Sequence, residues 1–160
     1  MSGWFVASIR DQQWYESPGF GFYSDWQQGE PFPQVGVNIG MVRPGEPNAM
    51  YHRESRQEGF LVLAGECLLI VEGEERTLRR WDYFHCPAGV DHILVGAGDG
   101  PCVVVAVGAR FGPNETVYPV EPAALKHGAG VERETTVPAE AYAPFPAAVP
   151  VPFREEFLGG

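Results

Sequence analysis

Between residues 35 and 108, glycine- and proline-rich turns divide the sequence into short apolar runs, and this punctuation limits the possible folds. In the first run Val35, Val37, Ile39 and Met41 alternate with glycine and asparagine. Alternation of period two predicts a half-buried strand. Further runs follow about every 8 to 12 residues without helical periodicity, which is typical of sandwiches and barrels. The other predicted strands span 60–63, 67–71, 77–80, 81–86, 91–95 and 102–107. The sequence therefore predicts an all-β fold that is closed or double-layered, so that no long edge stays open.

The segments on either side of this core differ in composition. Residues 1–33 hold three of the four tryptophans, among glycines and prolines, and we interpret them as an aromatic-rich arm that covers a sheet; an aromatic lining a pocket mouth is the alternative. Residues 111–160 hold eight of the fifteen prolines. There we expect extended chain, apart from one short helix at 122–126 that begins at a proline. The predicted organisation is an N-terminal arm (1–33), a barrel (34–110) and a C-terminal arm (111–160).

The C-terminal arm keeps large apolar side chains, including Phe145, Phe153 and Phe157. We expect this arm to lie along a surface, either of its own chain or of a partner subunit; a flexible tail is the alternative.

Charge and cysteine usage exclude several classes of function. With 11 basic and 21 acidic residues the net charge is −10, and no basic cluster could follow a phosphate backbone, so we expect no nucleic-acid partner. No run of about 18 apolar residues suggests a membrane span, and the N-terminus lacks the features of a secretory signal. The three cysteines form no CxxC pair, which fits a reducing compartment. We therefore expect a cytoplasmic protein.

The segment from Gly45 to Gly65 carries the chemistry. His52, Glu54 and Glu58 fall within seven residues, directly before an apolar run. Side chains two residues apart on an extended chain share a face, so His52 and Glu54 point the same way, and Glu58 joins them if the strand is unbroken. One imidazole with carboxylates outlines a divalent metal site that lacks a second imidazole. His92, which follows a Pro-Ala-Gly turn, is the candidate for it.

Together these two segments resemble the cupin family over about residues 35–108. The first cupin motif runs glycine, five residues, His-x-His, three or four residues, glutamate, six residues, glycine; the second runs glycine, five residues, Pro-x-Gly, two residues, histidine, three residues, asparagine. The first motif is matched by Gly45, His52, Glu54, Glu58 and Gly65, with Glu54 in place of the second histidine. The second is matched by Trp81, Pro87, Gly89, His92 and Gly96, with Trp81 replacing glycine and Gly96 replacing asparagine.

The resemblance implies a jelly-roll barrel, or double-stranded β-helix, with one divalent metal ion inside. Carried over by position, the ligands are His52, Glu58 and His92, and Glu54 is either a fourth ligand or a free carboxylate that could act as a base beside the metal. These ligand types suit zinc, iron or manganese more than copper. The alternative is that both histidines are ordinary pocket residues of a barrel without metal. Strand parity favours Cys86 over His85 as the side chain that faces the pocket.

Two classes of function remain open. The first is a metal-dependent enzyme, of the dioxygenase or the isomerase/lyase type, that acts on a small organic molecule. The second is a non-catalytic barrel that binds a small ligand. No signature for phosphate, sugar or flavonoid is present. The resemblance also implies a homodimer, and the long arms lead us to expect that one of them crosses the interface.

Overall fold

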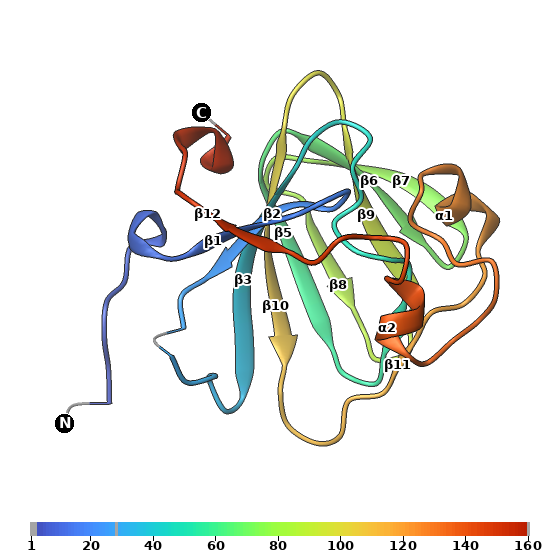
Figure 1. Cartoon of the computed structure of the whole chain (residues 1–160), viewed down its shortest axis with the longest axis horizontal. Helices are drawn as coiled ribbons and strands as arrows, with labels where there is room; N and C mark the ends of the chain where they lie inside the picture. The colour runs from blue at the N-terminus through green and yellow to red at the C-terminus, as the bar shows by residue number, and fades with distance from the viewer. Residues whose placement is uncertain (1–2, 28, 160) are drawn as a thin grey trace.

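The computed structural model describes residues 3–27 and 29–159, and it confirms the predicted all-β jelly-roll fold (Figure 1). A seven-stranded antiparallel sheet has the order β12-β1-β2-β3-β10-β5-β8, and a three-stranded sheet has the order β7-β6-β9. A short pair, β11-β4, completes the strands. The strands are β1 (Trp14–Ser17), β2 (Gly21–Asp25), β3 (Val35–Val42), β4 (Arg53–Glu54), β5 (Glu58–Ala64), β6 (Glu66–Val71), β7 (Glu74–Arg79), β8 (Tyr83–Cys86), β9 (His92–Ala97), β10 (Cys102–Ala109), β11 (Thr116–Val117) and β12 (Val149–Val151).

Helices are short. Two α-helices, α1 (Pro122–Lys126) and α2 (Pro138–Ala141), lie in the C-terminal segment, and 3-10 turns span Ile9–Asp11 and Glu155–Leu158. The first α-helix coincides with the prediction: Pro122 stands at its first turn and the Glu121 side chain accepts a hydrogen bond from the Ala123 N–H. The second was not predicted. No helix in the described part of the chain is long and apolar enough to cross a bilayer.

The barrel interior lies between the two sheets. Alternate side chains of β5, β10, β6 and β9 meet there, and the main cluster consists of Val42, Phe60, Val62, Cys67, Leu69, Cys86, Leu94, Cys102 and Val104. All three cysteines are buried and free. The period-two pattern thus has its expected physical cause, because one face of each strand is removed from water.

The outer faces of both sheets are covered by the terminal segments. Helix α1 supplies Ala123 and Ala124 to a cluster with Tyr51, Ile70 and Ile93 on the three-stranded sheet. The N-terminal segment adds β1 and β2 as strands of the large sheet, alongside β3. In Figure 1 the C-terminal segment, drawn in red, runs from α2 across the barrel to the opposite side.

The end of the chain packs into its own core. Phe157 is fully buried, with its ring centroid 4.7 Å from that of Trp14 and 4.6 Å from that of Phe22. Phe145 packs against Phe20, centroid to centroid 4.5 Å. Of the alternatives left open by the sequence, the structure shows the arm docked on its own chain.

The two departures from the second cupin motif differ in how well they fit the local backbone. Trp81 has a left-handed φ of 75°, which explains why the motif has glycine at this position, and there is room for its side chain because it is largely exposed. Gly96 is required because a Cβ at this position would collide with the carbonyl oxygen of Arg43. The Arg43 loop is held there by hydrogen bonds from Gly45 N to Gly96 O and from Gly96 N to Glu46 O, both 2.8 Å.

The buried position of Phe157 predicts that the C-terminal segment is part of the folding unit. Phe157→Ala should lower the free energy of unfolding by about 3–5 kcal/mol, because it leaves a cavity beside Trp14 and Phe22. Urea denaturation followed by tryptophan fluorescence measures this change. Phe111→Ala is the matched control, since this side chain is 72% exposed and its loss should change stability little. Equal stability of both variants would contradict the docked arrangement.

Candidate metal centre

The two histidines singled out by the sequence face each other across an isolated β-bridge. The His92 N–H donates to the His52 carbonyl at 2.8 Å, and the His52 N–H donates to the His92 carbonyl at 3.2 Å. Such a directly opposed pair holds its two side chains on neighbouring positions of the same surface. The ring centroids are accordingly 4.9 Å apart. The backbone therefore fixes both imidazoles before any ligand arrives.

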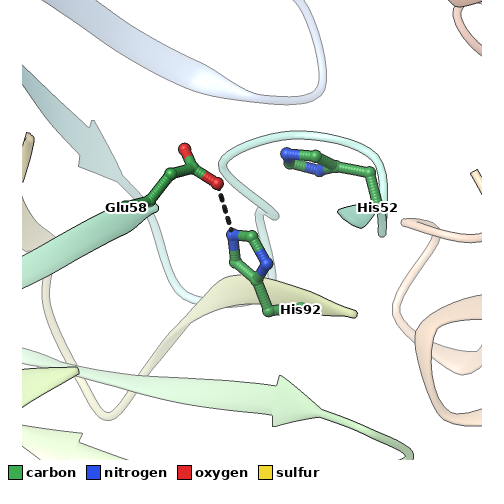
Figure 2. Close-up of side chains that lie close together, drawn as sticks. All are labelled: His52, Glu58 and His92. Atoms are coloured by element: carbon green, nitrogen blue, oxygen red, sulfur yellow. Dashed lines mark ion pairs between the residues drawn. The ribbon is translucent and has the colours of Figure 1, made fainter. Parts of the chain in front are cut away.

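Glu58 reaches the same space from the beginning of β5. Its strand pairs with β8 on one side and β10 on the other, at Cys86 and Gly108 respectively. The Glu58 Oε2 lies 3.3 Å from the His92 Nε2, the contact drawn as a dashed line in Figure 2. One ligand atom from each of His52, Glu58 and His92 lies within 4.8 Å of the others. Three donors from three segments thus converge on one point.

Hydrogen bonds to the backbone select the imidazole tautomers. The His52 Nδ1 lies 2.7 Å from the Met50 carbonyl oxygen, and the His92 Nδ1 lies 3.0 Å from the Val90 carbonyl oxygen. A carbonyl only accepts, so each Nδ1 carries the hydrogen and each Nε2 is left with a lone pair when the ring is neutral. Metal-binding histidines are oriented in this way.

Two buried polar atoms at this point are left without a hydrogen bond from any described residue. They are the Glu58 Oε2 and the His92 Nε2, which lie close together without the alignment of a hydrogen bond. A buried acceptor without a partner costs about 1–3 kcal/mol. A divalent cation would satisfy both atoms, and two imidazoles with one carboxylate are a ligand set used for zinc and non-haem iron. The residues present therefore fit a metal ion.

The surroundings shift the pKa values of the two imidazoles in opposite directions. Burial, and then the neighbouring charge of His92, lower the pKa of His52. Burial also acts to lower the pKa of His92, but the Cys86 thiol and the Glu58 carboxylate outweigh it and raise that pKa to about 10. Without an ion, one proton on His92 thus takes the place of the cation beside Glu58.

Glu54 lies beside this group rather than within it. Its Oε1 is 3.9 Å from the His52 Nε2, and its Oε2 accepts a hydrogen bond from the Asn114 side chain at 2.9 Å. The strand does not run unbroken from Glu54 to Glu58, because β4 ends at Glu54 and β5 begins at Glu58. The expectation that Glu58 shares a face with His52 and Glu54 required an unbroken strand, so strand alternation does not relate Glu54 to Glu58. The structure leaves Glu54 as a carboxylate next to a ligand, held from outside by Asn114.

Cys86 faces the interior and His85 is exposed, as strand parity predicted. The Cys86 Sγ lies 3.4 Å from the His92 Nδ1, so the thiol supports the ring from the side away from the proposed ion. The Cys86 thiol therefore contacts His92 and is not itself one of the three proposed metal ligands.

A cavity of about 290 Å³ opens in front of the three residues, which all line it. Its outer wall comes from outside the predicted barrel: Ser17, Phe20 and Tyr23 from the N-terminal segment and Tyr142 from the C-terminal one. This fits the alternative interpretation that N-terminal aromatics line a pocket mouth. Tyr142 was missed, and a single tyrosine in a proline- and alanine-rich segment offers no signal that would have identified it.

Residues 38–108 match the family described as the cupin domain. A sugar phosphate isomerase of the cupin superfamily from Silicibacter pomeroyi is 25% identical, with a TM-score of 0.53, over 59% of this chain and 63% of that one. A candidate sugar phosphate isomerase from Acidithiobacillus ferrooxidans is 22% identical, with a TM-score of 0.56, over 64% and 67%. The chain thus spans about two thirds of the length of these two proteins.

The polyketide cyclase RemF from Streptomyces resistomycificus is 16% identical, with a TM-score of 0.59, over 69% of this chain and 84% of that one. At this identity the likeness shows the fold alone. No curated protein matches the sequence.

The raised pKa of His92 predicts that metal binding expels a proton. The ion needs the Nε2 lone pair, which is protonated below a pKa of about 10, so affinity should rise with pH up to that value and then level off. At pH 7, calorimetric titration with Mn²⁺ in buffers of different ionisation enthalpy should report about one proton released per ion. A binding enthalpy that is the same in every buffer would contradict the protonated state.

The different positions of the two carboxylates predict different losses of metal affinity. Glu58→Gln should weaken Mn²⁺ binding by more than about 100-fold, the upper end of what removing a mere supporting residue costs. Glu54→Gln should weaken it by less than about tenfold, because Glu54 lies outside the ligand group. Calorimetry on the two variants makes the comparison, and an equal loss in both would make Glu54 a ligand.

Proposed function

Since the chain belongs to the cupin superfamily, we propose that it is a metal-dependent enzyme that acts on a small organic molecule, with the ion held by His52, Glu58 and His92. The observation that carries this proposal is the convergence of one ligand atom from each of these three residues, all within 4.8 Å of one another, beside a cavity of about 290 Å³. The ion is zinc, iron or manganese by the nature of its ligands. When bound it supplies a Lewis acid that polarises a carbonyl or hydroxyl oxygen of the substrate.

The position of Glu54 favours proton transfer of the isomerase/lyase type. Its carboxylate stands beside His52, within 3.9 Å, and is oriented by Asn114 without entering the metal group. A carboxylate placed next to a polarised carbonyl compound can accept the proton from the adjacent carbon and return it elsewhere. In this proposal Glu54 moves the proton, while His52, Glu58 and His92 hold the ion and the apolar wall excludes water.

The dioxygenase type is the second candidate. Two histidines and one carboxylate form the ligand set of many non-haem iron oxygenases, in which open positions remain for substrate and oxygen. A non-catalytic barrel that only captures a small ligand is the third outcome that experiment can return.

We also propose a homodimer in the cytoplasm, as expected from the resemblance. Several large apolar side chains are exposed, among them Trp81 and Tyr83, and an interface would cover such side chains. We also keep the prediction that a terminal arm crosses the interface. The C-terminal phenylalanines do not provide that contact, since they pack within their own chain.

Hydrogen exchange distinguishes the candidates. In D₂O, protein loaded with Mn²⁺ or Zn²⁺ should catalyse deuterium incorporation next to the carbonyl of hydroxyacetone, followed by NMR, and metal-free protein should not. Glu54→Gln should keep the ion but lose about 100-fold or more of this rate, the usual contribution of a general base.

Oxygen consumption by the iron-loaded protein with catechol, in the absence of deuterium exchange, would instead establish the dioxygenase type. Metal binding with neither activity on a broad panel of substrates would leave the non-catalytic barrel.

A further inference from the structure

The cavity in front of the proposed metal site has no lysine or arginine among the described residues that line it, whereas Glu58 lines it and Glu54 flanks His52. The His92 imidazole lines it as well, but its charge is paired with Glu58. Two arginines that follow lining residues in the chain are engaged elsewhere: Arg53 pairs with Asp91 at 3.0 Å and Arg43 with Glu46 at 3.5 Å. The whole chain carries a net charge of −10.

This distribution disfavours an anionic substrate. A phosphate that enters the cavity gives up its water and meets no guanidinium or ammonium group, and an unpaired buried charge is costly. A divalent ion beside Glu58 keeps positive charge for an oxygen of the substrate bound directly to it. It leaves none for a separate phosphate at the other end of the molecule.

The remaining wall is mostly apolar. Phe20, Phe60, Val42, Leu94 and Val104 line the cavity, together with the polar side chains of Ser17, Tyr23, Asn38 and Asn48. Its volume of about 290 Å³ lies at the lower end of the roughly 300–1,000 Å³ usual for small-molecule sites, which fits a molecule with one ring. The chemistry of the wall therefore asks for little charge and little hydrogen bonding over most of the ligand.

One hydroxyl group of the wall is linked to a proposed metal ligand. Tyr142 lines the cavity, and its hydroxyl oxygen accepts a hydrogen bond from the Met50 N–H at 3.0 Å. No described residue accepts the proton of this hydroxyl, and burial raises the pKa of Tyr142, so the proton is retained. The same Met50 residue offers its carbonyl to the His52 Nδ1 at 2.7 Å. Through the backbone of one residue, Met50, a hydrogen-bond donor is thus fixed relative to a proposed metal ligand.

We propose that the cavity binds an uncharged molecule with one ring and at least two oxygens, such as a hydroxyketone, and that Tyr142 donates a hydrogen bond to one of these oxygens. The other oxygen faces the ion, so this substrate class rests on the proposed function. Phosphorylated sugars are excluded. Tyr142 lies outside residues 38–108, so in this proposal the terminal segment contributes to selectivity together with the barrel wall.

The test compares three probes, one neutral and two phosphates, on the Mn²⁺-loaded protein by calorimetry. Maltol, a neutral one-ring hydroxyketone, should bind at least about tenfold more tightly than fructose 6-phosphate or inorganic phosphate, since only the phosphates carry a charge without a partner. Tyr142→Phe should weaken maltol binding about tenfold, the usual effect of one hydrogen bond, while Mn²⁺ affinity stays within twofold.

Tyr51→Phe is the matched control. Tyr51 is also buried and its hydroxyl also accepts a backbone N–H, from Gly73 at 3.3 Å, but it does not line the cavity. This variant should bind maltol like the unmodified protein. An equal loss in both variants, or a loss of Mn²⁺ affinity in Tyr142→Phe without a loss of maltol binding, would make Tyr142 a purely structural residue.

Two results would overturn the substrate class. The first is tighter binding of fructose 6-phosphate or inorganic phosphate than of maltol; the second is unchanged maltol binding in Tyr142→Phe. The titration with Mn²⁺ alone tests the proposed function separately. If that titration fails, the same comparison of probes on the metal-free protein still decides the substrate class. The lack of lysine and arginine among the lining residues does not depend on the ion.

Discussion

The paired backbone hydrogen bonds between His52 and His92 hold together the chemistry of this protein. They join two motifs that lie 40 positions apart in the chain, and they bring the two imidazole rings to a centroid distance of 4.9 Å. Glu58 then needs only the register of β5 to complete the group. Because β5 is paired on both sides and the two histidines are joined by their own backbone bridge, the donor atoms are positioned by the fold, and little ordering of side chains remains to be done when a ligand binds.

The parts of the fold that depend on local pattern could be predicted from the sequence. The alternation that begins at Val35 predicted β3, and the resemblance to the two cupin motifs indicated that His52, Glu58 and His92 meet. Glu54 could not be placed, since its direction depends on a break in the strand that local parity does not reveal. The docking of Phe157 on Trp14 was also beyond reach, because it pairs residues near opposite ends of the chain and no periodicity links them.

The terminal segments change the character of the site. Residues 38–108 supply the proposed ligands, whereas residues before 34 and after 110 line the cavity with aromatic rings and with the hydroxyl groups of Ser17, Tyr23 and Tyr142. The result is a pocket with a hard, acidic end and an apolar remainder. Relatives with the same barrel but different ends would present a different wall to the same ion, so the fold alone does not determine the substrate.

The central claim is that a single divalent ion is held by His52, Glu58 and His92. A crystal structure of protein grown with Mn²⁺ or Zn²⁺, with anomalous data at the absorption edge of the metal, tests this most directly. We expect one strong anomalous peak about 2.0–2.2 Å from the Nε2 atoms of both histidines and from a Glu58 oxygen. An empty space between these side chains at saturating metal, or an ion bound elsewhere, would contradict the account.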